Sequence, residues 1–376
     1  MSGYREPVVT PVAPLADDRG HAWFAGLRLR DAVECVDLAD PGALDRGGLW
    51  VVVAEFDGPG RAWRFAEVER DAAPAYEAPP AEWAGPAPDA WTSSVDRDTY
   101  LDGVEQIRQR IRAGDVYQVN LCRVLGAPLE PGEGREPDAA ALGARLAVAN
   151  PAPFEGGIHV PVASGLPPVW VVSASPELFV RIEDGRISSG PIKGTATSAA
   201  GLSDKDTAEN VMIADLVRND LQRVCAPGTV EVTGLLQVEA HPGLVHLVTT
   251  VAGRLLDVGW ADVLDATFPP ASVSGAPKRA ALDVIAGLEQ VRRGPYCGAF
   301  GWVDADAGRA ELAVAIRSFW WDAGDRMLRF GTGAGITWGS DAAAEWAETE
   351  LKAERLLALA SGEGARMGSV DEGSRA

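Results

Sequence analysis

Apolar residues recur along this chain at spacings that distinguish helices from strands. After Asp98, which can cap a helix, apolar side chains keep a near-helical spacing up to Gly114, which can end one; they are Leu101, Val104, Ile107 and Ile111. The next segment, from Val116 to Leu125, instead alternates and is rich in β-branched residues. The pattern therefore predicts a helix followed directly by a strand.

The predicted strand carries two neutral amides, Gln118 and Asn120, on one face, and apolar and aromatic residues on the other. Two amides on one face can orient a polar ligand without acting as a base. The same pattern also fits the solvent-exposed face of an edge strand. Spacing alone leaves both interpretations open.

Two further segments have the pattern of helices with acidic faces. The first runs from Ser203 to Val224, and Ser203 can form a variant capping box with Asp206. One stripe along it carries the carboxylates of Asp206, Glu209 and Asp220 together with the apolar Ile213. The second begins at Ser340 or Asp341, and one side of it carries Glu345, Glu348, Lys352 and Arg355.

Taken alone, each acidic face is typical of a solvated or salt-bridged surface helix. Carboxylates beside Ile213 would need a cation or a wet surface. Both faces offer oxygen ligands and no histidine, which suits Mg²⁺, because this ion binds one or two carboxylates together with waters and ligand oxygens. A metal site with one glutamate from each helix is therefore the functional alternative.

A lysine and a glutamate flank one short segment in the middle of the chain. Lys193 follows Pro191, which fixes its own φ angle, and precedes Gly194, which frees the backbone, so the segment reads as a strand that ends in a turn. An amine held in such a place can be a covalent nucleophile, and Glu177, in Ser-Pro-Glu-Leu, can be a proton donor. An isolated lysine of this kind is more commonly exposed on a loop.

Other candidate ligands follow in the second half of the chain. The glycine-rich stretch at 331–336 offers backbone N–H groups to a carboxylate or phosphate, although its glycines equally suit a tight turn, and it lacks the dinucleotide and P-loop spacings. Arg317, within the strand-like segment from Leu312 to Trp320, can clamp a carboxylate or lie at a rim. Tyr296 and Ser272 are further anchors, and His246 in an apolar strand fits a core histidine or a catalytic one.

Composition limits the class of protein. The 376 residues allow two domains or one large unit, and the formal net charge of -20 argues against a nucleic-acid partner. The four cysteines are far apart, which indicates neither a zinc site nor a disulfide framework and favours a reduced, cytoplasmic protein. No signal pattern and no membrane-length apolar run is present in the sequence.

The distribution of Pro, Ala and Gly predicts three parts. Residues 1–92 form a small N-terminal part that ends in a Pro- and Ala-rich linker, residues 93–360 form the main catalytic domain, and residues 361–376 form a disordered tail.

Taken together, these motifs resemble those of the chorismate-utilising enzymes. They occur in the same order as in that family and cover about residues 95–358. They are Tyr117-Gln118-Val119-Asn120-Leu121, Ser175-Pro176-Glu177, Pro191-Ile192-Lys193-Gly194-Thr195, Glu209-Asn210, Asp215-Leu216-Val217-Arg218-Asn219-Asp220, His246-Leu247-Val248, Ser274-Gly275-Ala276-Pro277-Lys278, Arg317-Ser318, Gly333-Ala334-Gly335-Ile336 and the segment from Glu345 to Lys352. The resemblance implies an α+β fold with large antiparallel sheets packed face to face, helices outside and the active site in the cleft.

Within that family, Lys193 implies the branch of aminodeoxychorismate synthase component I, which serves para-aminobenzoate and folate biosynthesis. Anthranilate synthase component I, the alternative, usually has Ala at this position, and salicylate and isochorismate synthases have a water-activating lysine where this chain has Gln118. The chain shows no recognisable tryptophan-site motif near its start. A non-catalytic chorismate-binding relative is a third possibility.

The resemblance also implies roles for individual residues. Lys193, Glu177 and His246 are expected at the catalytic centre, and Mg²⁺ is expected at Glu209 and Glu348, with Asp206 and Glu345 acting through waters. The substrate chorismate would contact Gln118, Thr195, Ser272, Tyr296, Arg317, Gly333, Ala334, Gly335 and Lys352. Because the chain has no glutaminase cysteine motif, a separate glutamine amidotransferase subunit is the expected source of ammonia.

Overall fold

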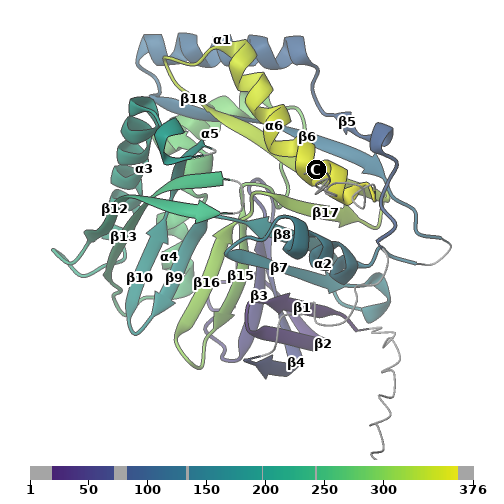
Figure 1. Cartoon of the computed structure of the whole chain (residues 1–376). Helices are drawn as coiled ribbons and strands as arrows, with labels where there is room; N and C mark the ends of the chain where they lie inside the picture. The colour runs from purple at the N-terminus through teal and green to yellow at the C-terminus, as the bar shows by residue number, and fades with distance from the viewer. Residues whose placement is uncertain (1–18, 72–82, 133–134, 197, 242–243, 363–376) are drawn as a thin grey trace, which may run out of the picture.

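In a computed structural model, the chain forms one long antiparallel sheet with helices on its outer surface (Figure 1). The structure describes residues 19–71, 83–132, 135–196, 198–241 and 244–362. This architecture confirms the expected α+β class. In the described part of the chain, no helix is long and apolar enough to cross a membrane.

The sheet has two halves, both built from antiparallel pairs. In the first half, β6 pairs with β18, β18 with β17, β17 with β8, and β8 with β7, while β5 and β14 flank β6. The bounds of these strands are β5 (Thr92–Ser93), β6 (Gln118–Pro128), β7 (Phe154–Val160), β8 (Val169–Ser175), β14 (Gly275–Ala276), β17 (Ser318–Asp322) and β18 (Met327–Ile336).

The second half continues from β3 through β15, β16, β9 and β10 to β13, and both β11 and β12 pair with β13. Its strands are β3 (Leu49–Ala54), β9 (Leu178–Glu183), β10 (Arg186–Gly190), β11 (Ile192–Ala196), β12 (Glu231–His241), β13 (Leu244–Arg254), β15 (Ala299–Asp304) and β16 (Arg309–Val314). Side chains of both halves, such as Val124, Ile158, Phe179 and Phe300, belong to one core cluster.

Three N-terminal strands join the two halves. They are β1 (His21–Phe24), β2 (Leu27–Asp37) and β4 (Gly60–Arg70), and the path runs from β7 through β1, β2 and β4 to β3. Strands before residue 92 therefore pair with strands after it. The tail predicted from residue 361 lies outside the described residues from 363 onward.

Helices cover the outer faces of the sheet. Helices α1 (Arg97–Ala113) and α5 (Lys278–Leu288) bury apolar side chains against β6 and β18, and α2 (Ala139–Ala149) and α6 (Ala342–Ala360) share a second cluster with β8 and β18. Helix α3 (Asp204–Gln222) packs on β11 and β13, next to α4 (Trp260–Thr267). Four short 3₁₀ turns complete the described elements: η1 (Pro88–Ala90), η2 (Val162–Ser164), η3 (Ala199–Gly201) and η4 (Ala271–Val273).

The predicted helix ends are mostly confirmed. Ser203 and Asp206 form the capping box of α3, Asp341 caps α6, and Gly114 ends α1 in the left-handed region with a φ of 86°. The prediction for the start of α1 was wrong, because Asp96 and not Asp98 is the cap. The carboxylate of Asp96 accepts the Thr99 N–H at 2.8 Å, whereas Asp98 lies inside the first turn.

The structure decides between the two open interpretations of one strand and corrects the prediction for another. Gln118 and Asn120 are buried, so they do not form the exposed face of an edge strand. The segment from Leu312 to Trp320 is not one strand, because the backbone breaks at Arg317, whose φ of 54° separates β16 from β17.

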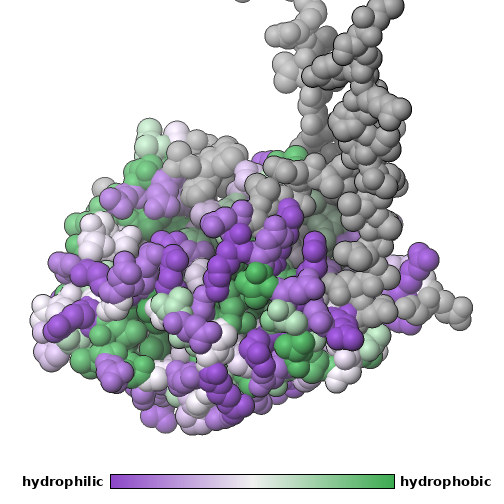
Figure 2. Space-filling model, turned by 90° about the horizontal axis from the view of Figure 1, so that it is seen from below, coloured by the Kyte–Doolittle hydropathy of each residue, from purple (hydrophilic) through white to green (hydrophobic). Residues whose placement is uncertain are grey.

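The outer surface of the molecule is mixed: in Figure 2, hydrophilic side chains surround smaller hydrophobic areas.

One glycine of β18 is required by a close approach. A Cβ on Gly331 would stand 2.0 Å from Cγ of Tyr296, whose ring is buried, so the ring lies directly against the backbone of β18. We therefore expect Gly331→Ala to lower the free energy of unfolding by about 1 to 3 kcal/mol, because the ring must move within a packed core. Urea unfolding followed by fluorescence measures this change.

Gly339→Ala is the matched control, since nothing lies within 4 Å of a Cβ at that position. Equal unfolding midpoints for the two variants would contradict the close packing of Tyr296 on Gly331.

Candidate active site

Lys193 lies on β11, at the point where this strand meets α3 and the β6–β18 pair. Its Nζ is 3.0 Å from the position that a Cβ on Gly335 would take, and Nε2 of Gln118 is 3.1 Å from the same point. A Cβ on Gly194, whose φ is 85°, would stand 2.8 Å from Cβ of Asp206. The amine, the amide of β6 and the backbone of β18 are therefore neighbours.

The pKa of Lys193 is lowered, and the main cause is desolvation of its ammonium. Glu209, Glu177 and Glu348 act in the opposite direction, while the nearby Lys352 adds to the lowering. These four charged neighbours surround the tip of the side chain. A larger fraction of neutral amine at neutral pH follows from this environment.

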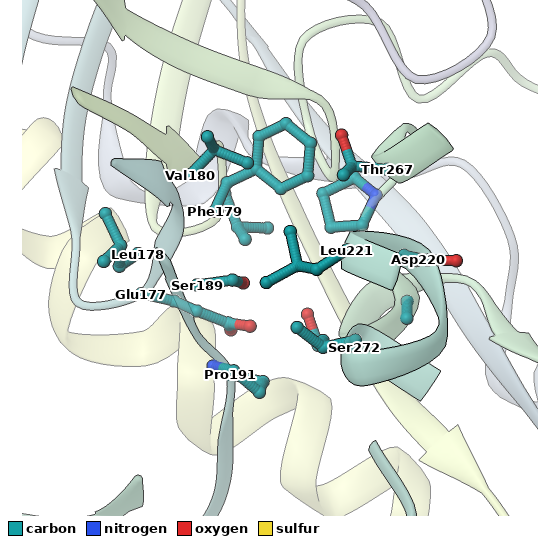
Figure 3. A pocket seen from close by; sticks show the side chains of 14 residues that line it. Glu177, Leu178, Phe179, Val180, Ser189, Pro191, Asp220, Leu221, Thr267 and Ser272 are labelled. Carbon is teal, nitrogen blue, oxygen red and sulfur yellow. The ribbon is translucent and has the colours of Figure 1, made fainter. Parts of the chain in front are cut away.

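Glu177 is buried between β8 and β9, and desolvation raises its pKa to about 7. A hydrogen bond from the Ser272 hydroxyl, the charge of Lys193 and the N–H of Ile192 each counteract this rise. Figure 3 shows the carboxyl of Glu177 pointing toward Ser272 across a small cavity. Apart from Asp220, Thr267, Ser189 and these two residues, the wall of the cavity is apolar. A carboxyl in this setting is protonated in part at neutral pH and can donate a proton.

Gln118 differs from its neighbour on the same face. Both Oε1 and Nε2 of Gln118 are buried and have no hydrogen-bond partner. The Asn120 side chain, by contrast, donates to Sγ of Cys122 at 3.0 Å. Buried polar atoms normally have partners, so the Gln118 amide is a candidate for ligand binding.

The carboxylates predicted to bind metal lie in the first halves of α3 and α6, and Lys205 links the two helices there. Nζ of Lys205 is 3.7 Å from Oε1 of Glu209 on α3 and 3.8 Å from Oε1 of Glu345 on α6. Nζ of Lys352 is 2.5 Å from Oε1 of Glu348. Glutamates of both helices thus surround common positive charges.

The pKa values of the two α6 glutamates move in opposite directions. Desolvation raises the pKa of Glu345, although Ser340 donates a hydrogen bond to it. Desolvation acts on Glu348 too, but Lys352, Lys193 and Lys205 together outweigh it and lower the pKa of this carboxyl. Glu348 is therefore ionised where a cation would bind.

These donors fit a hard divalent cation. They are carboxylate oxygens only, and the buried Oε1 of Glu209 accepts no hydrogen bond. In the part of the chain that the structure describes, three or more His, Cys, Asp or Glu side chains do not gather closely enough to form a complete metal site by themselves. Asp206 accepts from the N–H of Ser203 at 2.8 Å and so serves the helix cap. The arrangement fits an ion held by two glutamates, with waters and ligand oxygens completing its shell.

A second group of residues suits an anion. Arg317 is half-buried, and desolvation lowers the pKa of its guanidinium, while the Tyr296 phenol counteracts this change. Burial, together with Cys122 and Cys297, raises the pKa of Tyr296 well above its usual value, so the phenol stays protonated. Gly333 accepts a hydrogen bond from Nζ of Lys352 at 3.0 Å, on the edge of β18 that β17 leaves unpaired beyond Phe330.

The glycine-rich stretch does not form a tight turn, because it is the end of strand β18. Gly333, Ala334 and Gly335 pair with Cys122, Leu121 and Asn120 of β6. Because alternate residues of an antiparallel strand face each neighbour, Gly333 and Gly335 face the open edge. Their N–H groups are thereby directed away from β6.

His246 lies on β13, directly opposite Thr195 of β11 in the strand register, and is buried. The register of these two strands shifts between Ile192 and Thr195, the stretch that contains Lys193. The side chain of Thr195 lies outside the described residues. Ser272, Gln118 and Lys352 border the region of Lys193 and Glu177, whereas Tyr296 packs against Gly331 farther along β18.

The sequence did not predict the buried residues whose hydrogen bonds hold the strands and helices of this site together. Arg293 and Glu289 form a buried ion pair, with two N–H···O distances of 2.7 Å. Asn210 is also buried and donates to the carbonyl of Leu247 at 2.8 Å, which ties α3 to β13. The spacing of Glu289 and Arg293 is a signal for such a pair, but exposed pairs on helix surfaces have the same spacing.

A family model described as chorismate binding enzyme matches residues 61–358. Aminodeoxychorismate synthase component 1 of Salmonella typhimurium is 36% identical over 281 residues, which cover 71% of this chain and 59% of that protein. Anthranilate synthase component 1 of Saccharolobus solfataricus is also 36% identical, over 71% of this chain and 63% of that protein. The chain thus spans about three fifths of the length of the curated relatives that it matches.

Solved structures share the fold. A Bacillus anthracis protein described as a 2,3-dihydroxybenzoate-specific isochorismate synthase has a TM-score of 0.76 at 22% identity, over 92% of this chain and 97% of that chain. Anthranilate synthase component I from Streptococcus pneumoniae has a TM-score of 0.72 at 23% identity, over 95% of both chains. On the extent of the family match and the identity to these relatives, the chain belongs to the family of chorismate-binding enzymes.

Proposed function

We propose that this enzyme is an aminodeoxychorismate synthase component I, which converts chorismate and ammonia to 4-amino-4-deoxychorismate and water. The observation that supports it best is the pairing of Lys193 with Glu177. An amine of lowered pKa and a carboxyl whose pKa is about 7 lie close enough for each charge to act on the pKa of the other group. A lysine nucleophile must lose its proton and therefore needs a lowered pKa, whereas a carboxyl proton donor must keep its proton and needs a raised pKa.

Chorismate is a dianion, so its two carboxylates need separate partners. Arg317, Tyr296 and the N–H groups of Gly333 and Gly335 suit the enolpyruvyl carboxylate, because they combine a cation with directed donors. Mg²⁺, when bound by Glu209 and Glu348, would supply positive charge to the ring carboxylate. Ser272, Thr195 and Lys352 would add hydroxyl contacts and charge, and Asp206 and Glu345 would act through waters.

The chemistry proceeds in two displacements. Neutral Lys193 forms a bond from Nζ to ring C2, the ring double bonds shift, and the C4–O bond breaks while Glu177 protonates the departing hydroxyl as water. Ammonia then bonds to C4, the double bonds shift back, and the C2–Nζ bond breaks to release neutral lysine. The new C4 ammonium loses one proton, which restores the acid form of Glu177. Gln118 has no basic group, so water is not activated as a competing nucleophile. His246 supports the site from β13.

The ammonia would come from a glutamine amidotransferase subunit, as the "component 1" in the names of the relatives suggests a second component. We place the reaction in the cytoplasm, where free thiols such as Cys122 and Cys297 persist.

Anthranilate synthase is the second candidate, because relatives with that name match this chain at the same identity. The two reactions differ in their products, since only anthranilate synthase releases pyruvate and an aromatic amine. A non-catalytic chorismate binder would release neither product.

Replacing the lysine tests the covalent step. We expect Lys193→Ala and Lys193→Arg to lower the rate of aminodeoxychorismate formation from chorismate, Mg²⁺ and an ammonium salt by about 10³-fold, or about 4 kcal/mol in activation free energy. Arginine keeps the charge but offers no neutral amine. Mass analysis of the products measures the rate and distinguishes this enzyme from anthranilate synthase.

Without ammonium, the wild-type peptide that contains Lys193 should gain the mass of chorismate less one water. Turnover of Lys193→Ala at the wild-type rate would refute the covalent role.

The proton donor can be tested by its effect on stability. The pKa of Glu177 is higher in the folded protein, about 7, than the ordinary 4.5, so its contribution to stability is complete below pH 4.5 and is lost as pH rises through 7. We expect wild type to lose about 3 kcal/mol relative to Glu177→Gln between pH 4.5 and 8, because the amide does not ionise. Urea unfolding at each pH measures the difference.

Glu130→Gln, at an exposed position, is the control and should follow wild type. Parallel pH profiles for wild type and Glu177→Gln would show that this carboxyl is not held protonated by burial.

The metal site can be tested without turnover. We expect Mg²⁺ to raise the thermal midpoint of wild type, because an ion that binds only the folded state stabilises it. Glu209→Gln and Glu348→Gln should lose most of this rise, whereas Glu130→Gln should keep it. A full Mg²⁺-dependent rise in both site variants would exclude these two glutamates as ligands.

A further inference from the structure

Arg293 follows α5 in the chain and is completely buried, and its guanidinium is held by four hydrogen bonds. Two of them go to the carboxylate of Glu289, each at 2.7 Å. The other two go to the carbonyl oxygens of Val273, at 3.0 Å, and of Asn120, at 2.7 Å. The guanidinium also lies 4.1 Å from the ring centre of Phe56.

The two carbonyls belong to two adjacent segments, β6 and η4, each of which carries a residue of the site. Asn120 lies on β6, two residues after Gln118, whose amide is beside the Lys193 amine. Val273 lies in η4, directly after Ser272, which lines the same small cavity as the Glu177 carboxyl (Figure 3). One planar group therefore spans the strand beside the nucleophile and the turn beside the acid.

The rest of the environment keeps the guanidinium in place. Oε1 of Glu289 also accepts the N–H of Cys122 at 2.9 Å, so the carboxylate itself is anchored to β6. The carboxylate of Asp57 accepts the backbone N–H of Arg293 at 2.9 Å. A backbone hydrogen bond from Asn120 to the Ser274 carbonyl, at 2.9 Å, joins the same two segments.

Stability alone does not explain a charged pair at this position. Apolar residues of similar volume usually stabilise a core as well as a buried ion pair does. What an apolar pair lacks is directed donors. The fork of an arginine can bind a carboxylate and two carbonyls at once, and a lysine cannot reproduce that geometry.

We propose that Arg293 is a positioning residue, which sets the distance between β6 and η4 and thereby aligns the acid Glu177 with the nucleophile Lys193. It touches neither the substrate nor the reacting atoms. The effect of Arg293 on kcat depends on the function proposed above. Its effect on the alignment of Ser272 with Glu177 does not.

The test compares Arg293→Lys with Arg123→Lys. Arg123 is also buried on β6 and donates to Oγ1 of Thr349 at 2.9 Å, but it faces α6 and contacts neither η4 nor Glu177. Both variants should lose stability. Only Arg293→Lys should lower kcat with ammonium, by about 10²-fold with little change in the KM for chorismate, because misplacement affects the chemical step more than binding.

A second measurement does not need turnover. The Ser272 hydroxyl holds the pKa of Glu177 down against desolvation, so a shift of η4 away from this carboxyl should raise its pKa above 7. The pKa is read from the pH dependence of the unfolding free energy of Arg293→Lys relative to Arg293→Lys/Glu177→Gln. The same comparison in the Arg123→Lys background should give the wild-type value.

Should Arg293→Lys not fold, Arg293→Met/Glu289→Gln removes the buried charges and keeps an acceptor for Cys122. We expect it to fold and to show the same upward shift of the Glu177 pKa. A wild-type Glu177 pKa in a folded Arg293 variant, or equal kcat losses for Arg293→Lys and Arg123→Lys, would overturn the proposal. If wild type itself forms no aminodeoxychorismate, the proposed function fails while the titration still decides the role of Arg293.

Discussion

Desolvation of two ionisable groups, the Lys193 amine and the Glu177 carboxyl, is the constraint on which this site depends. Burial favours the neutral form of each group, so it acts in opposite directions on their pKa values. The same low dielectric would make an unpartnered charge very unfavourable. Glu209 counteracts the lowering of the Lys193 pKa, and the Ser272 hydroxyl and the charge of Lys193 counteract the rise of the Glu177 pKa.

The fold supplies this enclosure through strand pairing more than through loops. Lys193 projects from β11 in one half of the sheet, and Gly335 and Gln118 lie on β18 and β6 in the other half. The two halves are continuous through the N-terminal strands β1, β2 and β4. The walls of the site therefore belong to one hydrogen-bonded framework, and the acidic helices α3 and α6 close it from the outside.

Local features could be predicted from the sequence, and long-range ones could not. The capping box at Ser203 and the left-handed Gly114 are set by neighbouring residues, so the pattern identified them. The break at Arg317 was missed because the residues on both sides of it are equally strand-like. Arg293 was missed for a different reason: whether a pair of charges at helical spacing is buried depends on distant segments, here β6 and η4. Motif resemblance gathered the candidate residues, but only the structure reveals which of them touch.

Gly335 is a position of the site at which there is no room for a side chain. The space that a side chain would occupy at this position is taken by the tip of Lys193 and by the Gln118 amide. A methyl group at this position would displace the Lys193 amine, although no reactive residue would have been substituted. Divergence among enzymes on this scaffold can therefore begin at a residue that has no chemistry of its own, and an inventory of reactive side chains would not detect it.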